Sequence, residues 1–318
     1  MKNLIILLAG VLSSVNLYAG NREKSPFKTF SFSASSVKEV EASSIGGSIV
    51  VDGNDKCSEV LVELYILCNP NWSDEKIKQT LKENFIVDVR VEKGKLYAVA
   101  KSKKSSRANE LDLGFSFKIT VPEKINSNLK TSLSEIQIRN LSGSHNIKTS
   151  GSSLTVENVS GSIAGKTSDG NVFITNANGN IEIITSRGDV TGNKLSGKIK
   201  LTTSGGKHTG DINAPHFGNI KLDNISGSVD ARTSDSEINV NMLSLNEHVK
   251  LSNTGNIVIS MPTGKGYNIK ASSGQKIETL GLKDFKGKKE DTKIEGKIGD
   301  GGPKIEIKSS KEINLIFM

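Results

Sequence analysis

Residues 158–197 read NVSGSIAGKTSDGNVFITNANGNIEIITSRGDVTGNKLSG, and two short motifs alternate through this stretch and beyond it. The first motif is N-x-S-G or a close variant, and it begins at Asn140, Asn158, Asn176, Lys194 and Asn224. The second motif opens with Thr-Ser, and it begins at Thr149, Thr167, Thr185, Thr203 and Thr233. The steps in both series are 18, 18, 18 and 30 residues. The elementary unit is therefore nine residues, the full repeat is eighteen, and the longest step contains a 12-residue insertion near 207–218.

Within each nine-residue unit, polar and apolar residues alternate after a turn residue that is usually Gly. The residue after the turn is polar, and the second one is Ile, Val or Leu everywhere except at His145 and His208. The fourth residue is uncharged in every unit. Alternation with a period of two is typical of a half-buried β-strand, and Gly, Ser and Asn favour turns. Each unit is therefore predicted to be a short strand with inward apolar side chains, followed by a turn.

A single unit of this kind cannot bury its apolar edge, whereas stacked units form one continuous core. The sequence therefore predicts an all-β fold in which residues 126–318 form a single-stranded parallel β-solenoid, or β-helix. Each 18-residue coil would hold two short strands, and capping strands would close the C-terminus. The usual crossover bias favours a right-handed coil. The nine-residue period disfavours a hexapeptide helix, and the scattered Asp residues disfavour a calcium-binding roll.

The segment 20–125 is predicted to be rich in β-strands and to contain one helix near 73–85, with Ser73 as a suitable N-cap. Cys57 and Cys68 bracket a strand-like run in this segment. If that run is one strand, the two sulfurs lie roughly 30 Å or more apart, too far for a disulfide. The two cysteines pair only if the run folds back on itself.

The first nineteen residues are predicted to be a signal peptide. Lys2 supplies a positive charge, residues 4–12 are mainly apolar, and Ala19 is a small residue at the expected cleavage site. The apolar stretch is shorter than the ~20 residues that a membrane-spanning helix needs. We therefore expect export to the periplasm or the cell surface, without a transmembrane span.

The chain carries 42 Lys and Arg against 34 Asp and Glu, a formal net charge of +8 over 318 residues. The densest basic patches, at 101–107 and 283–289, lie in Ser- or Gly-containing segments between strand-like runs. Nucleic-acid binding requires a continuous basic face with stacking aromatic residues, so we expect no nucleic-acid partner. The patches are interpreted as solvated hairpin tips, with contact to an anionic glycan or lipid surface as the alternative.

The sequence shows no constellation of reactive residues. The four His residues lack metal-ligand spacing, so we expect no metal and no cofactor. His208 and His216 share the insertion and are the candidates for a local ligand-binding feature.

Glu182 and Asp230 are outward acids, but they are scattered and mark no pair of the kind that a glycosidase needs. An R-G-D triplet at 187–189 has its Gly in phase with the repeat, which already explains it. We therefore predict that the chain has no catalytic residue and is not an enzyme.

Three features resemble the bacterial putative-adhesin family of β-strand-repeat proteins, most of whose members have no established function. They are F-x-I-x-V-P at 117–122, the alternating N-x-S-G and T-S-x-G turns, and GKIGDGGPKIEIKSS at 296–310. The resemblance covers about residues 27 to 318 and implies a β-helical fold, export to the cell envelope and an adhesin label. It supplies no catalytic residues. The chain departs from the pattern at Ser236, where a turn Gly is expected, and at the insertion.

Together these features predict a non-enzymatic, exported, adhesin-like binding or structural protein of the bacterial cell envelope. A carbohydrate-active β-helix enzyme and a periplasmic scaffold for a partner protein are the alternatives. The partner is left open between a glycan and an envelope or host protein.

Overall fold

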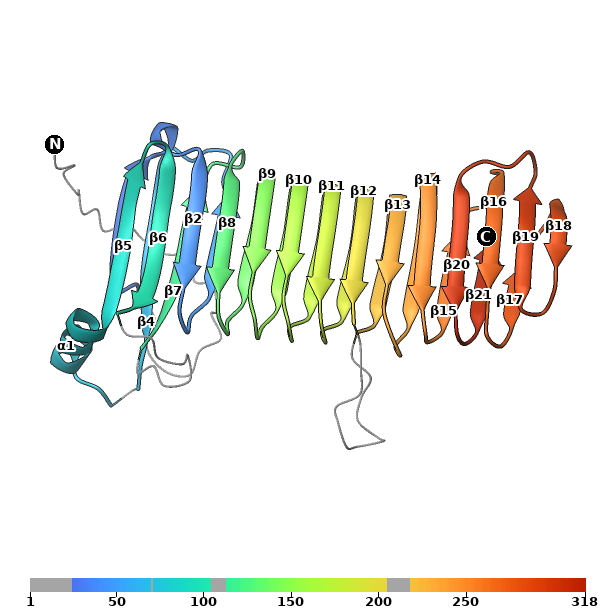
Figure 1. The fold of residues 1–318 in the computed structure, drawn as a ribbon. Helices are drawn as coiled ribbons and strands as arrows, with labels where there is room; N and C mark the ends of the chain where they lie inside the picture. Colours follow the sequence, from blue (N-terminus) through green and yellow to red (C-terminus); the bar gives the residue numbers. More distant parts are fainter. Residues whose placement is uncertain (1–24, 70, 104–112, 205–217) are drawn as a thin grey trace. The chain divides into compact units, whose positions relative to one another are not determined.

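The chain is mostly β-structure, with one α-helix among the residues that the structure describes (Figure 1). The computed structural model describes residues 25–69, 71–103, 113–204 and 218–318. The signal peptide predicted at 1–19 and the candidates His208 and His216 lie outside these ranges. The chain forms two compact units, Met1–Ser152 and Ser153–Met318. The boundary at residue 125, where the repeat pattern was expected to begin, stays a prediction.

The first unit begins with short strands and a helix. Its elements are β1 (Lys28–Ser33), a 3-10 turn (Ala34–Ser36), β2 (Glu39–Ser44), β3 (Ile49–Gly53), β4 (Glu59–Leu67), α1 (Asp74–Asn84), β5 (Phe85–Glu92), β6 (Lys95–Ser102), β7 (Gly114–Val121), β8 (Asn126–Thr131) and β9 (Ile136–Lys148). Helix α1 confirms the predicted helix, and the Ser73 side chain accepts a hydrogen bond from the Lys76 backbone N–H at 3.3 Å. Because β4 is one strand, Cys57 and Cys68 flank opposite ends of it, and no disulfide joins them.

In the first unit, strands from the beginning of the chain lie in the sheet between strands that follow much later in the sequence. Strand β2 pairs in parallel with both β6 and β8, and β3 pairs in parallel with both β7 and β9. Antiparallel pairs link β1 to β4, β4 to β7, and β5 to β6. A strand with neighbours on both sides has its backbone groups paired along both edges. The inward side chains of β3, Ile49 and Val51, are fully buried.

The second unit holds the long strands of the repeat. Its elements are β10 (Leu154–Lys166), β11 (Val172–Thr185), β12 (Val190–Thr203), β13 (Ile220–Arg232), β14 (Ile238–Asn253), β15 (Ile257–Met261), β16 (Tyr267–Ser272), β17 (Ile277–Leu280), β18 (Phe285–Lys289), β19 (Lys293–Ile298), β20 (Lys304–Ser309) and β21 (Ile313–Phe317). Strands β10 to β14 stack side by side in parallel (Figure 1). Val172 pairs with Val190, one repeat later, and Val190 pairs with Ile220. The step of 30 is therefore one repeat plus a 12-residue insertion, as predicted.

The inward positions predicted from the alternation form the core of the stack. Their side chains are at most 3% exposed in β10 to β14, and they include Leu154, Val172, Val190, Ile220, Ile238, Val156, Ile174, Leu201, Leu222 and Val240. A third buried series went unnoticed in the sequence. It is the residue after the first position of each N-x-S-G motif, namely Leu141, Val159, Ala177, Leu195 and Ile225. The signal was present, because this position is apolar in every copy.

The expectation of two short strands per repeat is wrong, because each repeat forms one strand of 13 to 16 residues. The N-x-S-G motif lies inside that strand and bends it. Asn176 has a φ of 52° and Gly179 a φ of 130°, and the hydrogen-bonded register continues on both sides of the bend. A Cβ on Gly179 would lie 2.0 Å from the Gly161 carbonyl oxygen, so only glycine fits this corner. The bend is therefore a corner within a strand rather than a loop between two strands.

The second motif breaks the strand, and its threonine is buried. Thr167, Thr185, Thr203 and Thr233 are 1–3% exposed. The Thr185 hydroxyl accepts a hydrogen bond from the Gly188 N–H at 3.1 Å and donates one to the Gly170 carbonyl at 3.2 Å. It thereby closes its own turn and ties that turn to the one in the preceding repeat. The sequence identifies this threonine as a repeat position, but it does not reveal that the hydroxyl links two neighbouring turns by hydrogen bonds.

The predicted capping role of the C-terminal strands is also wrong. Strand β20 pairs in parallel with β14 and with β16, and β21 pairs in parallel with β15 and with β17 (Figure 1). The last strands are therefore inserted into the stack instead of lying at its edge. The inserted strands add their apolar side chains to the core, since Ile305, Ile307, Ile313 and Leu315 are at most 3% exposed. Strand β18, which pairs only with β19, bears three exposed lysines, a composition that discourages edge-to-edge association.

Replacing Thr185 with valine is expected to destabilise the protein by about 1–3 kcal/mol, because a buried N–H and a carbonyl lose their shared partner. Urea unfolding followed by circular dichroism measures the change. Thr191→Val is the matched control, since Thr191 is exposed on β12, and we expect a change within about 0.5 kcal/mol. An equal decrease in the free energy of unfolding in both variants would show that the hydrogen bonds of the buried hydroxyl do not stabilise the stack.

Deleting residues 304–318 is expected to loosen β16 to β19, because β16 and β17 lose their parallel neighbours, β18 and β19 are attached through β16, and Val249 and Leu251 of β14 become uncovered. Limited trypsin digestion with mass spectrometry should find cleavage within 262–303 in the shortened chain and protection in the full chain. Glu306→Gln, a change at an exposed side chain, is the control and should stay protected. Protection of 262–303 after the deletion would contradict the inserted arrangement.

Candidate functional site

One outward row of the second unit alternates acidic and basic side chains from strand to strand. In the order of the paired strands, the row is Glu182, Lys200, Asp230, Lys250, Glu306, Lys270, Glu295 and Lys288. Opposite charges that face each other across strands contribute roughly 0.2–1 kcal/mol each. This charge ladder therefore neutralises itself and contributes to the stability of the stack.

If the protein were a carbohydrate-active enzyme, Glu182 and Asp230 would be its candidate acids, and the charge ladder separates them. Glu182 and Asp230 lie on β11 and β13, and Lys200 of the intervening β12 faces both. The Lys200 ammonium donates a hydrogen bond to Glu182 Oε1 at 2.8 Å, and this bond raises the pKa of the lysine. A glycosidase needs room for a sugar between its two carboxyl groups, but here a lysine side chain lies between them.

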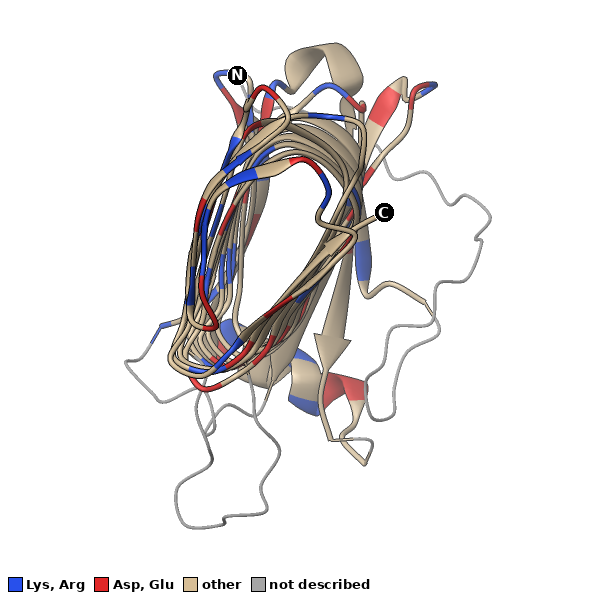
Figure 2. Cartoon of the chain, turned by 90° about the vertical axis from the view of Figure 1, so that its right-hand side faces the viewer, with Lys and Arg blue, Asp and Glu red and all other residues tan. Residues whose placement is uncertain are grey.

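A neighbouring outward row is not neutralised. It runs from His248 through Lys304, Asn268 and Lys297 to Lys286. We call Lys304, Lys297 and Lys286 the lysine row. All three are exposed, and within the described part of the chain none forms an ion pair. Figure 2, in which the C-terminal strands face the viewer, shows basic and acidic segments following each other along the ribbon.

The lysine row belongs to a wider basic face, which we define as the outward side chains of four neighbouring strands, β20, β16, β19 and β18. These are Lys304, Glu306, Lys308, Asn268, Lys270, Ser272, Lys293, Glu295, Lys297, Lys286 and Lys288. A hollow of 380 Å³ lies on this face, and Lys270, Lys286, Lys297 and Lys304 contribute to its lining. Seven lysines against two glutamates leave the face with an excess of positive charge.

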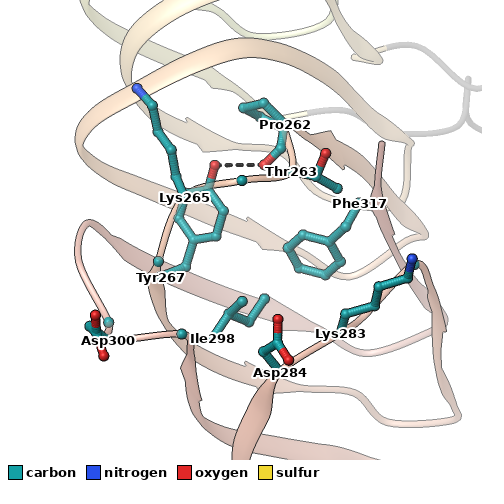
Figure 3. A pocket seen from close by; sticks show the side chains of 14 residues that line it. Pro262, Thr263, Lys265, Tyr267, Lys283, Asp284, Ile298, Asp300 and Phe317 are labelled. Carbon is teal, nitrogen blue, oxygen red and sulfur yellow. Dashed lines mark hydrogen bonds between the residues drawn. The ribbon is translucent and has the colours of Figure 1, made fainter.

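A second hollow, of 690 Å³, lies among the loops that connect β15 to β16, β17 to β18 and β19 to β20 (Figure 3). Its lining includes Tyr267 and Phe317, whose ring centroids are 6.3 Å apart, and Tyr267 donates a hydrogen bond to the Pro262 carbonyl at 2.8 Å. Both rings are buried, at 1% and 7% exposure, so they offer little surface for stacking. Two charges of each sign line the pocket, from Lys265, Lys283, Asp284 and Asp300, so it is suited to hydrogen bonding rather than to an aromatic or apolar ligand.

The R-G-D triplet is engaged within the fold. Arg187 pairs with Asp169 at 2.5 Å, and Asp189 Oδ1 accepts backbone hydrogen bonds from Gly218 and Asn219 at 2.9 and 2.8 Å. A Cβ on Gly188 would lie 1.8 Å from the Gly170 carbonyl oxygen. The triplet is therefore a turn of the repeat, in agreement with the interpretation from phase.

His145 of β9 fills the inward slot that the alternation predicts. Its side chain is 1% exposed, and Nδ1 shares a hydrogen bond with Ser127 Oγ at 3.0 Å. Burial lowers the pKa of the imidazole to about 4, because the charged form would lose its hydration. His145 is thus a neutral core residue, whereas His248 lies at the partly exposed end of the lysine row.

Among the residues that the structure describes, no cluster of three or more His, Cys, Asp or Glu could hold a metal ion. Burial raises the pKa of the Cys57 thiol above its usual value. No helix in the described ranges is long and apolar enough to cross a membrane.

Comparison with known proteins gives one family match and several distant structural likenesses. The model of the family "Toastrack DUF4097" matches residues 86–314. No curated protein matches. Among solved structures, a putative cell adhesion protein from Clostridium sporogenes is 12% identical, with 92% of this chain and 98% of that one covered and a TM-score of 0.21.

Two further structures come from Bacteroidetes. A putative adhesin from Bacteroides fragilis is 12% identical, covers 91% of this chain and 95% of its own, and has a TM-score of 0.34. A putative lipid binding protein from Parabacteroides distasonis is 14% identical, covers 92% and 97%, and has a TM-score of 0.36. Identities and TM-scores this low carry no ligand over to this chain.

The neutral state of His145 predicts a pH dependence of stability. Its pKa is about 4 in the folded chain and about 6.5 when unfolded, so its contribution is complete above pH 6.5 and is lost as the pH falls toward 4. The loss amounts to at most about 1.4 kcal/mol per pH unit from this group. Urea unfolding between pH 7 and 4 should therefore show a shallower decline for His145→Val than for the wild type.

Ser127→Ala is the control for this experiment. It removes the hydrogen bond to His145 but leaves the imidazole buried, so we expect the wild-type pH dependence. If His145→Val and the wild type decline in parallel, then burial of this imidazole does not contribute to acid sensitivity.

Proposed function

We propose that this chain, which belongs to the toastrack DUF4097 family, is an exported, non-enzymatic, adhesin-like binding protein of the bacterial cell envelope, built as a β-solenoid. The outward surface of the second unit is the observation that carries the proposal. Stacked strands hold rows of polar and charged side chains at a fixed spacing, while the apolar residues form ladders in the core. Extended repeat surfaces of this kind are suited to binding large partners.

The solenoid part of the proposal rests on the eighteen-residue register. Every repeat from β10 to β13 adds one bent strand to the same stack, and Thr-Ser turns at Thr167 and Thr185 lead from β10 to β11 and from β11 to β12. Successive levels related in this way correspond to successive coils. The bend at N-x-S-G and the break at Thr-Ser would be the two corners of each coil.

Export is supported by the sequence of residues 1–19, which fits both a periplasmic and a surface location. Adhesion requires that the polar rows face other molecules outside the cell, and a protein kept in the periplasm could act only on periplasmic partners. The periplasmic scaffold is therefore the alternative that localisation can distinguish.

The carbohydrate-active enzyme is the less favoured alternative. Its candidate acids are engaged in the charge ladder, with Lys200 between Glu182 and Asp230. Turnover of an acidic glycan that is lost on changing Glu182 or Asp230 to the corresponding amide would revive this alternative. The proposal instead expects binding without change to the glycan.

Protease shaving of intact cells tests the location. Cells expressing the full chain are treated with proteinase K, and the chain is detected by blotting beside a periplasmic control protein. We expect digestion of this chain and protection of the control. Protection of both would reject surface adhesion and favour a periplasmic scaffold. Digestion of both would mean that the outer membrane was breached, so the assay is repeated with intact cells until the control is protected.

A further inference from the structure

We propose that the basic face binds a linear anionic polysaccharide, a glycan chain with carboxylate or sulfate groups, laid across strands β20, β16, β19 and β18. The inference deepens the proposed function by naming the ligand class, and it rests on that function. It starts from the contrast between two adjacent rows of the same strands. The charge ladder is neutral, whereas the lysine row is not.

Charge defines the ligand as an anion. Lys286, Lys297 and Lys304 are exposed and form no ion pair with any described residue. The nearest acids on these strands, Glu295 and Glu306, belong to the charge ladder, where lysines flank them on both sides. A second copy of this protein would present the same positive row and would be repelled. The complementary partner therefore carries repeated negative charge.

Spacing defines the ligand as a polymer. The lysine row crosses four hydrogen-bonded strands, with Asn268 between Lys304 and Lys297. At about 4.8 Å between strands, three cations are spread over roughly 15 Å. A single small anion could contact one or two of them, whereas an extended chain with a charge on each repeat can contact all three. The 380 Å³ hollow along this row is a depression in which the polysaccharide can lie.

The side chains of the face favour a glycan over a lipid surface or a nucleic acid. Every outward position of the face is polar or charged, and Ile269, Ile294 and Ile305 point inward with at most 2% exposure, so the face offers no outward apolar side chain to a membrane. Binding of single-stranded nucleic acid uses exposed aromatic platforms, and the outward positions here are Lys, Glu, Asn and Ser. Glutamate and asparagine oxygens can accept hydrogen bonds from sugar hydroxyls, while the lysines contact the anionic groups.

Binding of the purified chain without residues 1–19 to immobilised polygalacturonate tests the proposal. Neutral dextran and vesicles of phosphatidylglycerol are the comparison surfaces. The test variant is Lys286→Gln, Lys297→Gln, Lys304→Gln. The matched control is Lys56→Gln, Lys124→Gln, Lys311→Gln, which removes the same charge from exposed positions outside the basic face and outside both hollows. Circular dichroism and thermal unfolding of both variants check that the fold is retained.

We expect the wild type to bind polygalacturonate and not dextran, and to release it as salt approaches about 1 M, where the Debye length is about 3 Å. The test variant should bind about tenfold more weakly, and the control should bind within about twofold of the wild type. Equal weakening of the two variants would mean that net charge alone is responsible and would overturn the site. Binding to vesicles but not to the polymer would overturn the glycan in favour of a lipid surface.

The outcome is separable from that of the shaving experiment. If the lysine row binds the polymer but intact cells protect the chain, surface adhesion fails and the site stands. If the chain is digested on intact cells but binds no anionic polymer, the adhesin-like function stands and the assignment of the basic face fails.

Discussion

Parallel hydrogen bonding in an eighteen-residue register constrains everything else in the second unit. Each residue of β11 faces the residue one repeat later in β12, so a feature of one strand meets the same feature on its neighbour. Inward aliphatic residues of successive strands therefore line up as a ladder, and the corner glycines line up as a column. The column tolerates no side chain, because a Cβ on Gly197 would lie 2.2 Å from the Gly179 carbonyl oxygen.

Polar groups inside the stack are satisfied by the same repetition. The hydroxyl of Thr203 donates to the carbonyl of Gly188, as that of Thr185 does to Gly170. At the corner, the Asn176 amide donates to Asn158 Oδ1 at 2.8 Å. A buried or strained group that would be costly alone is thus hydrogen-bonded to a group of the preceding repeat. The insertion between β12 and β13 leaves this pattern intact, since the register resumes at Ile220.

The register also decides what the outer surface can do. Where opposite charges alternate, as from Lys200 to Asp230, neighbouring strands neutralise each other. Where lysines recur without acids, as from Lys297 to Lys286, the strands add their charges. Two rows on the same strands therefore differ in function, one stabilising the stack and the other available to an anionic ligand. A surface of this type binds through many weak contacts and needs no enclosed catalytic pocket.

Local sequence patterns specified the nine-residue unit, the inward ladders, the size of the insertion and helix α1, because each depends on neighbours a few residues apart. The bend within each strand, the buried hydroxyl of Thr185 and the lysine row were not accessible in this way. The row exists because β20, at the end of the chain, is inserted between β14 and β16, which places Lys304 beside His248 and Asn268. Alternation tells which side of a strand is buried, but it does not tell which distant strand lies beside it. The neighbours across the sheet, and with them the charges of the binding face, were decided by tertiary pairing alone.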